Sequence, residues 1–374
     1  MSRPPCVTAL PLIGRDRLEQ TPSRAQAHIA SLDGIRALSI LLVLACHMLP
    51  LGPARFALNP TAGALGMTLF FALSGFLITR FLWKNQDIPT FLVRRIARIA
   101  PLVLLVTAIY CLILQDRPDS FIAANLYVLN YWHSALNPWI SPLWSLGVEM
   151  QFYLAIALAV ALCGRQGFWL VGIAAVVVTG MRIDLDAFAN IQTHLRIDEI
   201  LAGSLLAVAY ENRARGWAGT VWRRLPMAFW PLLVLLVMSS SPLFAPVYYF
   251  RPYFAALFIG SVLAMSDTQG ETWQTRVLSL RGLGYIATIS FALYVWHSPF
   301  RHFWFDEGTT VERYLFKRPL AFLCLFALAH LSTFYFEKPI LRLARKVPVR
   351  RAALASGEAR GGAAETPDPA RDPA

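Results

Sequence analysis

Charged residues are scarce in this sequence. They make up only 15% of its 374 residues, whereas 56% are hydrophobic, and soluble domains usually carry about 25% charged residues. The mean hydropathy is +0.50, which leaves too little polar surface to cover two or three water-soluble domains. This composition excludes an ordinary soluble protein and predicts an all-α polytopic membrane protein.

Cysteine is scarce too. The chain has five cysteines, an odd number that argues against a secreted fold held by disulfides. No two of them are two to four residues apart, so no metal site of the zinc type is expected. The first thirty residues lack an uninterrupted apolar core followed by a cleavage site, which argues against a removable signal peptide. We expect residues 1–30 to be a disordered cytoplasmic segment.

Apolar runs, by contrast, are abundant, and ten of them can cross about 30 Å of hydrocarbon. They lie near residues 33–50, 63–83, 97–114, 143–163, 167–181, 197–211, 226–241, 246–265, 283–300 and 319–337. An eleventh candidate, residues 121–132, is shorter and contains Asn125 and Asn130. The ten runs predict one bundle of about ten transmembrane helices. This membrane domain is expected at 31–341, followed by a basic and then low-complexity cytoplasmic tail at 342–374.

The positive charges decide between ten and eleven spans. The chain has 34 Lys and Arg against 22 Asp and Glu, a net charge of +12. With ten spans and a cytoplasmic N-terminus, 25 of the 34 basic residues lie on the cytoplasmic side, whereas an eleventh span would divide them 17 and 17. Because Lys and Arg near span ends stay cytoplasmic, we expect residues 115–142 to be an outer loop and both termini to be cytoplasmic. The excess charge then reflects topology, and no nucleic acid partner is expected.

Few ionisable residues lie inside the spans, and each is costly at membrane depth. Arg36 and His47 are eleven residues apart in the first span, which places them about 16 Å apart on nearly the same helix face. In the simpler interpretation, Asp33 caps the helix, Arg36 reaches lipid headgroups and His47 fills the interface. The basic group of Arg94, Arg95 and Arg98 just before Pro101 either binds phosphates or anchors headgroups.

Glu149 lies about two turns into an otherwise apolar or aromatic span. A buried carboxylate needs a partner, and the predicted topology brings His47 and His297 to a similar depth near the outer side. A carboxylate beside an imidazole favours its charged form or selects its tautomer. The sequence therefore predicts a site in which Glu149 contacts one of these two histidines.

Seven motifs follow one another along the chain: LDGIRALSILLVLACH, FFALSGFLITR, RRIARIAP, PLWSLGVEMQFYL, RIDEILAGSLLA, ISFALYVWHSP and YFEKPI. In this order they resemble the membrane-bound acyltransferase-3 family. Members of that family transfer acyl groups, most often acetyl, from acyl-CoA to surface glycans and other exported acceptors. The resemblance covers most of the chain.

The resemblance also implies roles for individual residues. His47 is expected to be catalytic, as a general base or an acyl relay, with Glu149 orienting an imidazole. Arg36, Arg95 and Arg98 are expected to bind the phosphates and pantetheine of acyl-CoA. Residues expected to line the site or contact the substrate are Trp144, Ser145, Arg196, Glu199 and His297. Glu337, just before Lys338 and Pro339, is expected to end the last helix.

The implied function is an integral O-acyltransferase of the bacterial plasma membrane, most simply an O-acetyltransferase using acetyl-CoA. The expected acceptor is a hydroxyl of an exported or lipid-linked carbohydrate such as exopolysaccharide, O-antigen or capsule, with glycan-assembly machinery as a further partner. An appended hydrolase-like domain, found in some members, is not visible, so acceptor selection is expected in outer loops or in a partner.

Two alternatives are a transporter or flippase with an intramembrane Arg/His/Glu pathway and an inactive scaffold. The densest Gly and Ser fall in one span only, which disfavours a transporter.

Overall fold

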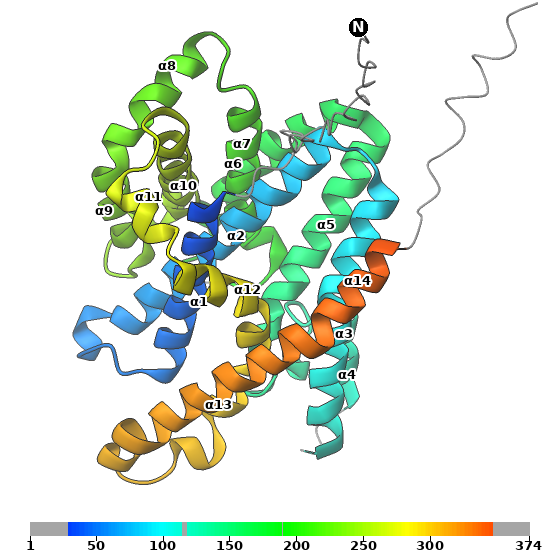
Figure 1. The fold of residues 1–374 in the computed structure, drawn as a ribbon, viewed down its shortest axis with the longest axis vertical. Coiled ribbons are helices and arrows are strands. Elements are labelled where there is room, and N and C mark those ends of the chain that lie inside the picture. Colours follow the sequence, from blue (N-terminus) through cyan, green and yellow to red (C-terminus); the bar gives the residue numbers. More distant parts are fainter. Residues whose placement is uncertain (1–28, 114–117, 189, 347–374) are drawn as a thin grey trace, which may run out of the picture.

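The computed structural model describes residues 29–113, 118–188 and 190–346. These residues form helices joined by turns, with no strand among them (Figure 1). The predicted all-α class is therefore confirmed. Residues 1–28 and 347–374, which hold most of the predicted N-terminal segment and tail, lie outside the described residues.

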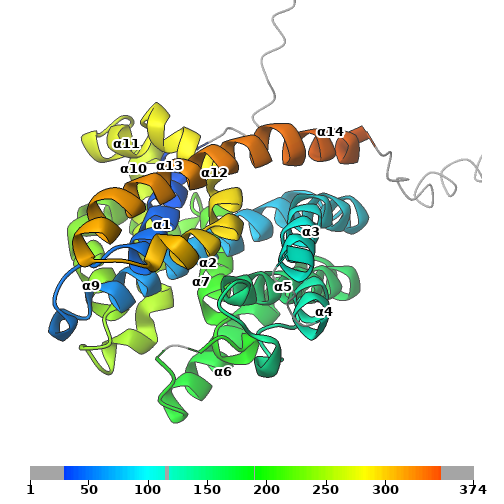
Figure 2. The same cartoon turned by 90° about the horizontal axis from the view of Figure 1, so that it is seen from below.

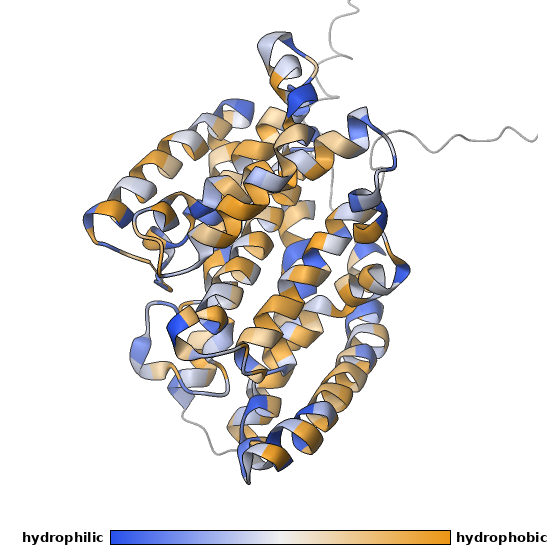
Figure 3. Cartoon of the chain, turned by 90° about the vertical axis from the view of Figure 1, so that its left-hand side faces the viewer, coloured by the Kyte–Doolittle hydropathy of each residue, from blue (hydrophilic) through white to orange (hydrophobic). Residues whose placement is uncertain are grey.

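Every predicted run corresponds to a helix. The ten helices are α1 (Ala30–Met48), α2 (Leu58–Lys84), α3 (Ile88–Ile113), α5 (Trp144–Cys163), α6 (Trp169–Asp184), α7 (Asp198–Glu211), α9 (Phe229–Ser240), α10 (Arg251–Thr268), α12 (Arg281–Trp296) and α13 (Arg318–Leu331). Seven stretches of the described residues are long and apolar enough to cross a membrane. Apolar residues also dominate the long helices in Figure 3, as expected for a multi-pass membrane protein.

The remaining helices are short. They are α4 (Pro118–Asn125), α8 (Gly216–Arg224), α11 (Trp273–Leu278) and α14 (Lys338–Lys346). With eight residues, α4 is too short to cross the hydrocarbon, which needs about 20 residues. The segment considered as an eleventh span thus forms one short helix followed by turns. The side of the membrane on which it lies stays a prediction.

The centre of the bundle is built by α1, α2, α7 and α12. Helix α1 packs against both α2 and α12, and α2 crosses α7 closely. A Cβ added to Gly75 of α2 would lie 1.9 Å from the carbonyl oxygen of Ile200, and one on Gly203 of α7 would lie 1.9 Å from that of Ala72. The small residues of the second span therefore permit a close helix contact, as small residues do in membranes.

The C-terminal helices form one continuous rod along the outside of the bundle (Figures 1 and 2). Helix α13 packs on α12, and α14 packs on α3. A π-helical turn, Ser332–Glu337, joins α13 to α14, so the expectation that Glu337 ends the last helix is wrong. The wide turn lets the chain continue, and Pro339 sits near the start of α14, where the missing N–H is tolerated.

Candidate active site

Two histidines from different helices meet directly. His47 lies in the last turn of α1 and His297 follows the last residue of α12. Nδ1 of His47 is 2.9 Å from Nε2 of His297, and the two rings are parallel, with centroids 5.0 Å apart. His297 is fully buried, whereas His47 is partly exposed. The structure thus joins the two imidazoles that the sequence placed at a similar depth.

The hydrogen bonds assign a tautomer to each ring. Nδ1 of His297 is 2.6 Å from the carbonyl oxygen of Tyr294. A carbonyl only accepts, so this nitrogen of His297 carries a proton, and Nε2 of the neutral ring is an acceptor. Nδ1 of His47 must then donate to it. Nε2 of neutral His47 is left with a lone pair, and no other described residue contacts it through a hydrogen bond. This nitrogen of His47 can accept a proton.

A second feature is a cavity of about 80 Å³ between the helices, which we call the arginine cavity. Its lining includes Arg36 of α1, Arg95 and Arg98 of α3, and Glu149 of α5. Arg36 also forms an ion pair with Asp33 at 3.2 Å. The structure therefore gathers on one cavity all three guanidinium groups for which the resemblance implies a phosphate-binding role. Arg94 does not line this cavity and is exposed.

Glu149 does not pair with either histidine, contrary to the sequence expectation. Its buried carboxylate hydrogen bonds to Ser74 of α2 and to Tyr153 one turn further along α5, and the hydroxyls of those two residues are 3.2 Å apart. The carboxylate also faces Arg95. Similar depth in a bundle does not determine which neighbour a side chain faces, because the rotation of each helix decides that. Ser74 and Tyr153 were not identified from the sequence as partners.

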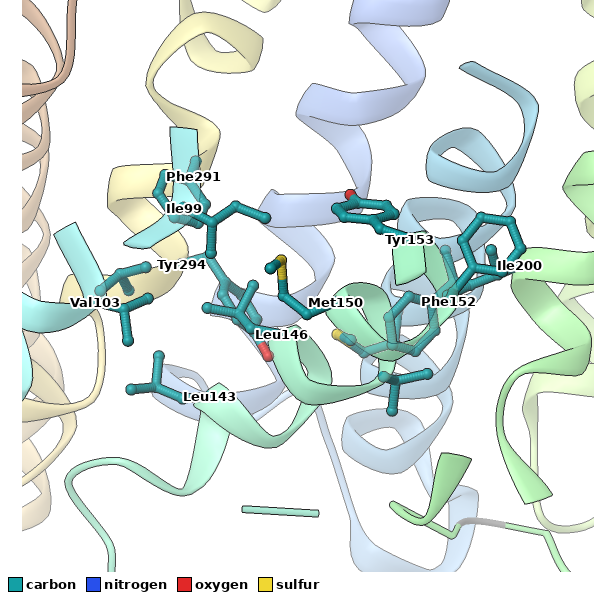
Figure 4. Close-up of a cluster of buried hydrophobic side chains, with 14 of the residues drawn as sticks. Ile99, Val103, Leu143, Leu146, Met150, Phe152, Tyr153, Ile200, Phe291 and Tyr294 are labelled. Atoms are coloured by element: carbon teal, nitrogen blue, oxygen red, sulfur yellow. The ribbon is translucent and has the colours of Figure 1, made fainter. Parts of the chain in front are cut away.

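A smaller cavity of about 10 Å³, which we call the apolar cavity, lies beside the arginine cavity. Phe70 and Ser290 line both cavities. The remaining lining of the apolar cavity is Ser39, Ile40, Val43, Met67 and Tyr294. Ile99 and Phe291 also line the arginine cavity, and Figure 4 shows them in one cluster of buried side chains with Leu146, Met150 and Tyr294.

Tyr294 supports the histidine pair, and the sequence analysis did not identify it. Its carbonyl holds His297, its hydroxyl donates to the carbonyl of Pro142, and the hydroxyl of Ser145 donates to it at 2.7 Å. The available signal was spacing, because Tyr294 lies three residues before His297, about one turn. Ser145 therefore contacts the Tyr294 hydroxyl rather than a histidine. Trp144 packs edge-on against Phe71.

Arg196 and Glu199 belong to a separate network of buried charges. Arg251 donates to Oε1 of Glu199 at 3.0 Å, and Thr68 donates to the same oxygen at 2.7 Å. Arg196 approaches the other oxygen at 3.5 Å, and its guanidinium lies 5.7 Å from the ring centre of Trp144. Neither Arg196 nor Glu199 lines either cavity. Their expected role in lining the site stays a prediction, and their position is that of a brace between α2, α7 and α10.

Arg301 is a cation close to the pair that the sequence analysis did not single out. It lies in a 3₁₀ turn four residues after His297, and its charge acts on both His47 and His297. Its guanidinium forms no hydrogen bond or ion pair with another described residue. Its neighbour Arg318, by contrast, is paired with Asp306 at 2.7 Å.

Comparison with known proteins adds a family. The model described as an acyltransferase domain matches residues 29–338 of the chain. The peptidoglycan O-acetyltransferase OatA of Listeria monocytogenes is 25% identical over 371 aligned residues, which cover 86% of this chain and 57% of OatA. The Bacillus subtilis protein named "Putative peptidoglycan O-acetyltransferase YrhL" is 25% identical, over 84% of this chain and 55% of its own length.

This chain thus spans little more than half the length of these curated relatives. No solved structure matches it. The family model covers α1 to the start of α14 and includes the histidine pair and both cavities.

Proposed function

The chain belongs to the acyltransferase family whose model covers residues 29–338, and from this premise we propose that it is a membrane O-acetyltransferase. The donor is acetyl-CoA, and the acceptor is a hydroxyl of a cell-envelope glycan. The observation that carries the proposal is the arginine cavity, which adjoins the apolar cavity next to the histidine pair. In the predicted topology the cavity opens toward the cytoplasm, where CoA is found, and His47 lies near the outer side.

The arginine cavity suits the phosphates of CoA. Arg95 and Arg98 form no ion pair with another described residue, and Arg36 has only Asp33 at 3.2 Å. Guanidinium groups bind phosphate through paired, charge-assisted hydrogen bonds. The nucleotide part is therefore expected at the mouth of the cavity, with the acyl-pantetheine arm directed along α1 toward His47.

The proposed chemistry needs one base and one leaving group. The acceptor hydroxyl attacks the thioester carbonyl while Nε2 of His47 takes its proton, so a C–O bond forms as negative charge gathers on the carbonyl oxygen. Arg301 is the nearby cation that can stabilise this charge. The C–S bond then breaks, the proton passes from His47 to the departing sulfur, and CoA and the acetyl ester are the products. His297 stabilises the protonated imidazole through the hydrogen bond at 2.9 Å.

The proposed acceptor is a glycan of the bacterial cell envelope, and the proposed location of the enzyme is the inner membrane. Two relatives are named as peptidoglycan O-acetyltransferases, one of them putatively, and the sequence motifs favour exported polysaccharide in general. Both are polymers rich in hydroxyls that lie outside the cytoplasm. A membrane enzyme with a cytoplasmic donor site and an outer base connects the two compartments.

Acetyl transfer by membranes that contain the chain tests this proposal. Labelled acetyl-CoA is supplied on the cytoplasmic side, and acetyl esters on extracted envelope glycans are measured by mass spectrometry. His47→Ala is expected to abolish transfer at unchanged protein abundance. His330→Ala is the matched control, because His330 contacts Tyr285 and Phe334 away from the cavities. Retained acetylation in His47→Ala would overturn the assignment, and substrate uptake without acetyl-CoA would favour a transporter.

A further inference from the structure

We propose that the apolar cavity receives the methyl end of the acyl group and that Val43 and Met67 set the length of acyl chain the protein accepts. This inference rests on the proposed function, and it assigns the acyl subsite within it. Three lines of observation carry it: the position of the cavity, the state of its polar groups and the rigidity of its walls.

The position of the apolar cavity follows from the order in which residues of three helices line the two cavities. On α1, Arg36 lines the arginine cavity, Ile40 and Val43 line the apolar cavity, and His47 follows one turn later. These four positions are spaced by three or four residues and share one helix face.

Helices α2 and α12 repeat this order. On α12, Ser290 lines both cavities, Tyr294 lines the apolar cavity, and His297 follows. On α2, which runs the opposite way, Ser74 lines the arginine cavity and Met67 the apolar one. The apolar cavity therefore lies between the arginine groups and the histidine pair.

The polar groups of this cavity are already satisfied. Ser39 donates to the carbonyl of Arg36 at 2.7 Å, and Ser290 donates to that of Ala287 at 2.8 Å. The Tyr294 hydroxyl is used by Pro142 and Ser145. The cavity thus presents carbon atoms to an occupant, and its volume of about 10 Å³ is close to the room that a single water-sized sphere needs. A methyl group suits this space better than water, which needs two to four polar partners.

The walls cannot easily move apart. A Cβ on Gly66 of α2 would lie 2.6 Å from the carbonyl oxygen of Ser39 and 3.0 Å from Cγ2 of Val43, so α1 and α2 are in backbone contact at this level. Extra methylenes in a packed interior force side chains out of their rotamers. A longer acyl chain would have to displace Val43, Met67 or Phe70. The Met67 side chain lines the cavity, and shortening it to alanine would enlarge the cavity directly.

The experiment measures kcat/KM for acetyl-, propionyl-, butyryl- and hexanoyl-CoA with the full chain in nanodiscs and an extracted glycan acceptor. Wild type is expected to use acetyl-CoA at least about tenfold better than butyryl-CoA, since one methylene is discriminated by about 10- to 200-fold in a tight pocket. Met67→Ala and Val43→Ala are expected to lower this ratio by about tenfold or more. Met150→Ala, a buried methionine of α5 outside both linings, is the control and is expected to keep the ratio.

A variant that makes the cavity smaller tests the inference even if the alanine variants fail to fold. Val43→Ile adds one methyl to the wall and is expected to reduce propionyl transfer more than acetyl transfer. Equal use of acetyl- and butyryl-CoA by wild type, or an unchanged ratio in Met67→Ala and Val43→Ala, would overturn the inference alone. No transfer from any acyl-CoA by wild type would overturn the proposed function and this subsite with it.

Discussion

Two groups of charged residues within the helix bundle have nearly the same composition but differ in burial and pairing. The arginine cavity has three guanidinium groups with Asp33 and Glu149 nearby. The second group, which we call the buried network, has Arg182, Arg196 and Arg251 with Asp198 and Glu199.

The difference lies in pairing. In the buried network, Arg182 forms an ion pair with Asp198, and Arg251 forms one with Glu199. In the arginine cavity, Arg95 and Arg98 have no such partner among the described residues. Three arginines among apolar helices are thus not in themselves a binding site. Arg182 and Arg251 hold carboxylates and connect helices of the bundle, whereas Arg95 and Arg98 line a cavity without an ion pair to a described residue, as the proposed binding of an anionic ligand requires.

The largest expected effect is on the stability of the buried network. Glu199→Ala leaves the fully buried Arg251 without its carboxylate, and removal of one partner of a buried pair costs about 3–5 kcal/mol. Thermal unfolding of detergent-solubilised protein should show a large loss of folded chain. Glu211→Ala breaks a more exposed pair with Arg80 and is expected to cost under about 1 kcal/mol. Equal melting of the two variants would contradict the bracing role.

A smaller effect is expected when an arginine of the arginine cavity is replaced, and the quantity that changes is the transfer activity rather than the stability. Arg98→Gln removes a charged donor that has no ion pair to lose, so stability is expected to change by less than about 1 kcal/mol. A hydrogen bond to a charged group contributes about 1.5–3 kcal/mol, which corresponds to a fall of about 10- to 150-fold in kcat/KM for acetyl-CoA. Steady-state kinetics at several donor concentrations provides the measurement. A variant that unfolds like Glu199→Ala would place Arg98 with the bracing residues.

The smallest expected effect concerns Tyr294. Its side chain contributes to helix packing, and its backbone carbonyl holds His297. Tyr294→Phe keeps the backbone carbonyl that holds His297 and removes the hydroxyl bonded to Pro142 and Ser145. We expect a loss of about 1 kcal/mol in stability and less than a tenfold fall in transfer rate. His297→Ala, in contrast, removes the acceptor for His47 and should reduce transfer far more. Similar rates for the two variants would show that the hydroxyl, rather than the carbonyl, orients the pair.

Much of the fold was accessible from the sequence because the relevant signal is local. The length and hydropathy of each run predicted a helix where the structure has one, and the Asn-containing segment 121–132 forms a short helix followed by turns. How many of the ten helices cross the membrane stays a prediction. The close crossing at Gly75 and Gly203 and the π-helical turn before Lys338 depend on neighbouring helices. The hydropathy of a segment does not report on contacts with other helices. The prediction that Glu337 ends the last helix was therefore wrong.

The site divides in the same way. Arg36 and His47 share a helix face that spacing alone identifies. The convergence of Arg95 and Arg98 on Arg36 was expected only from the resemblance. The prediction that Glu149 contacts His47 or His297 was wrong, because equal depth in the membrane does not determine how each helix is rotated about its axis. The roles of all these residues in transfer stay predictions.

The most direct measurement is the dissociation constant of CoA for the full chain in nanodiscs. The account predicts saturable binding by wild type, a Kd raised at least about tenfold in both Arg95→Gln and Arg98→Gln, and an unchanged Kd in Arg94→Gln, whose exposed guanidinium lies outside the cavity. An equal Kd in all four proteins would contradict the assignment of the arginine cavity as the donor site.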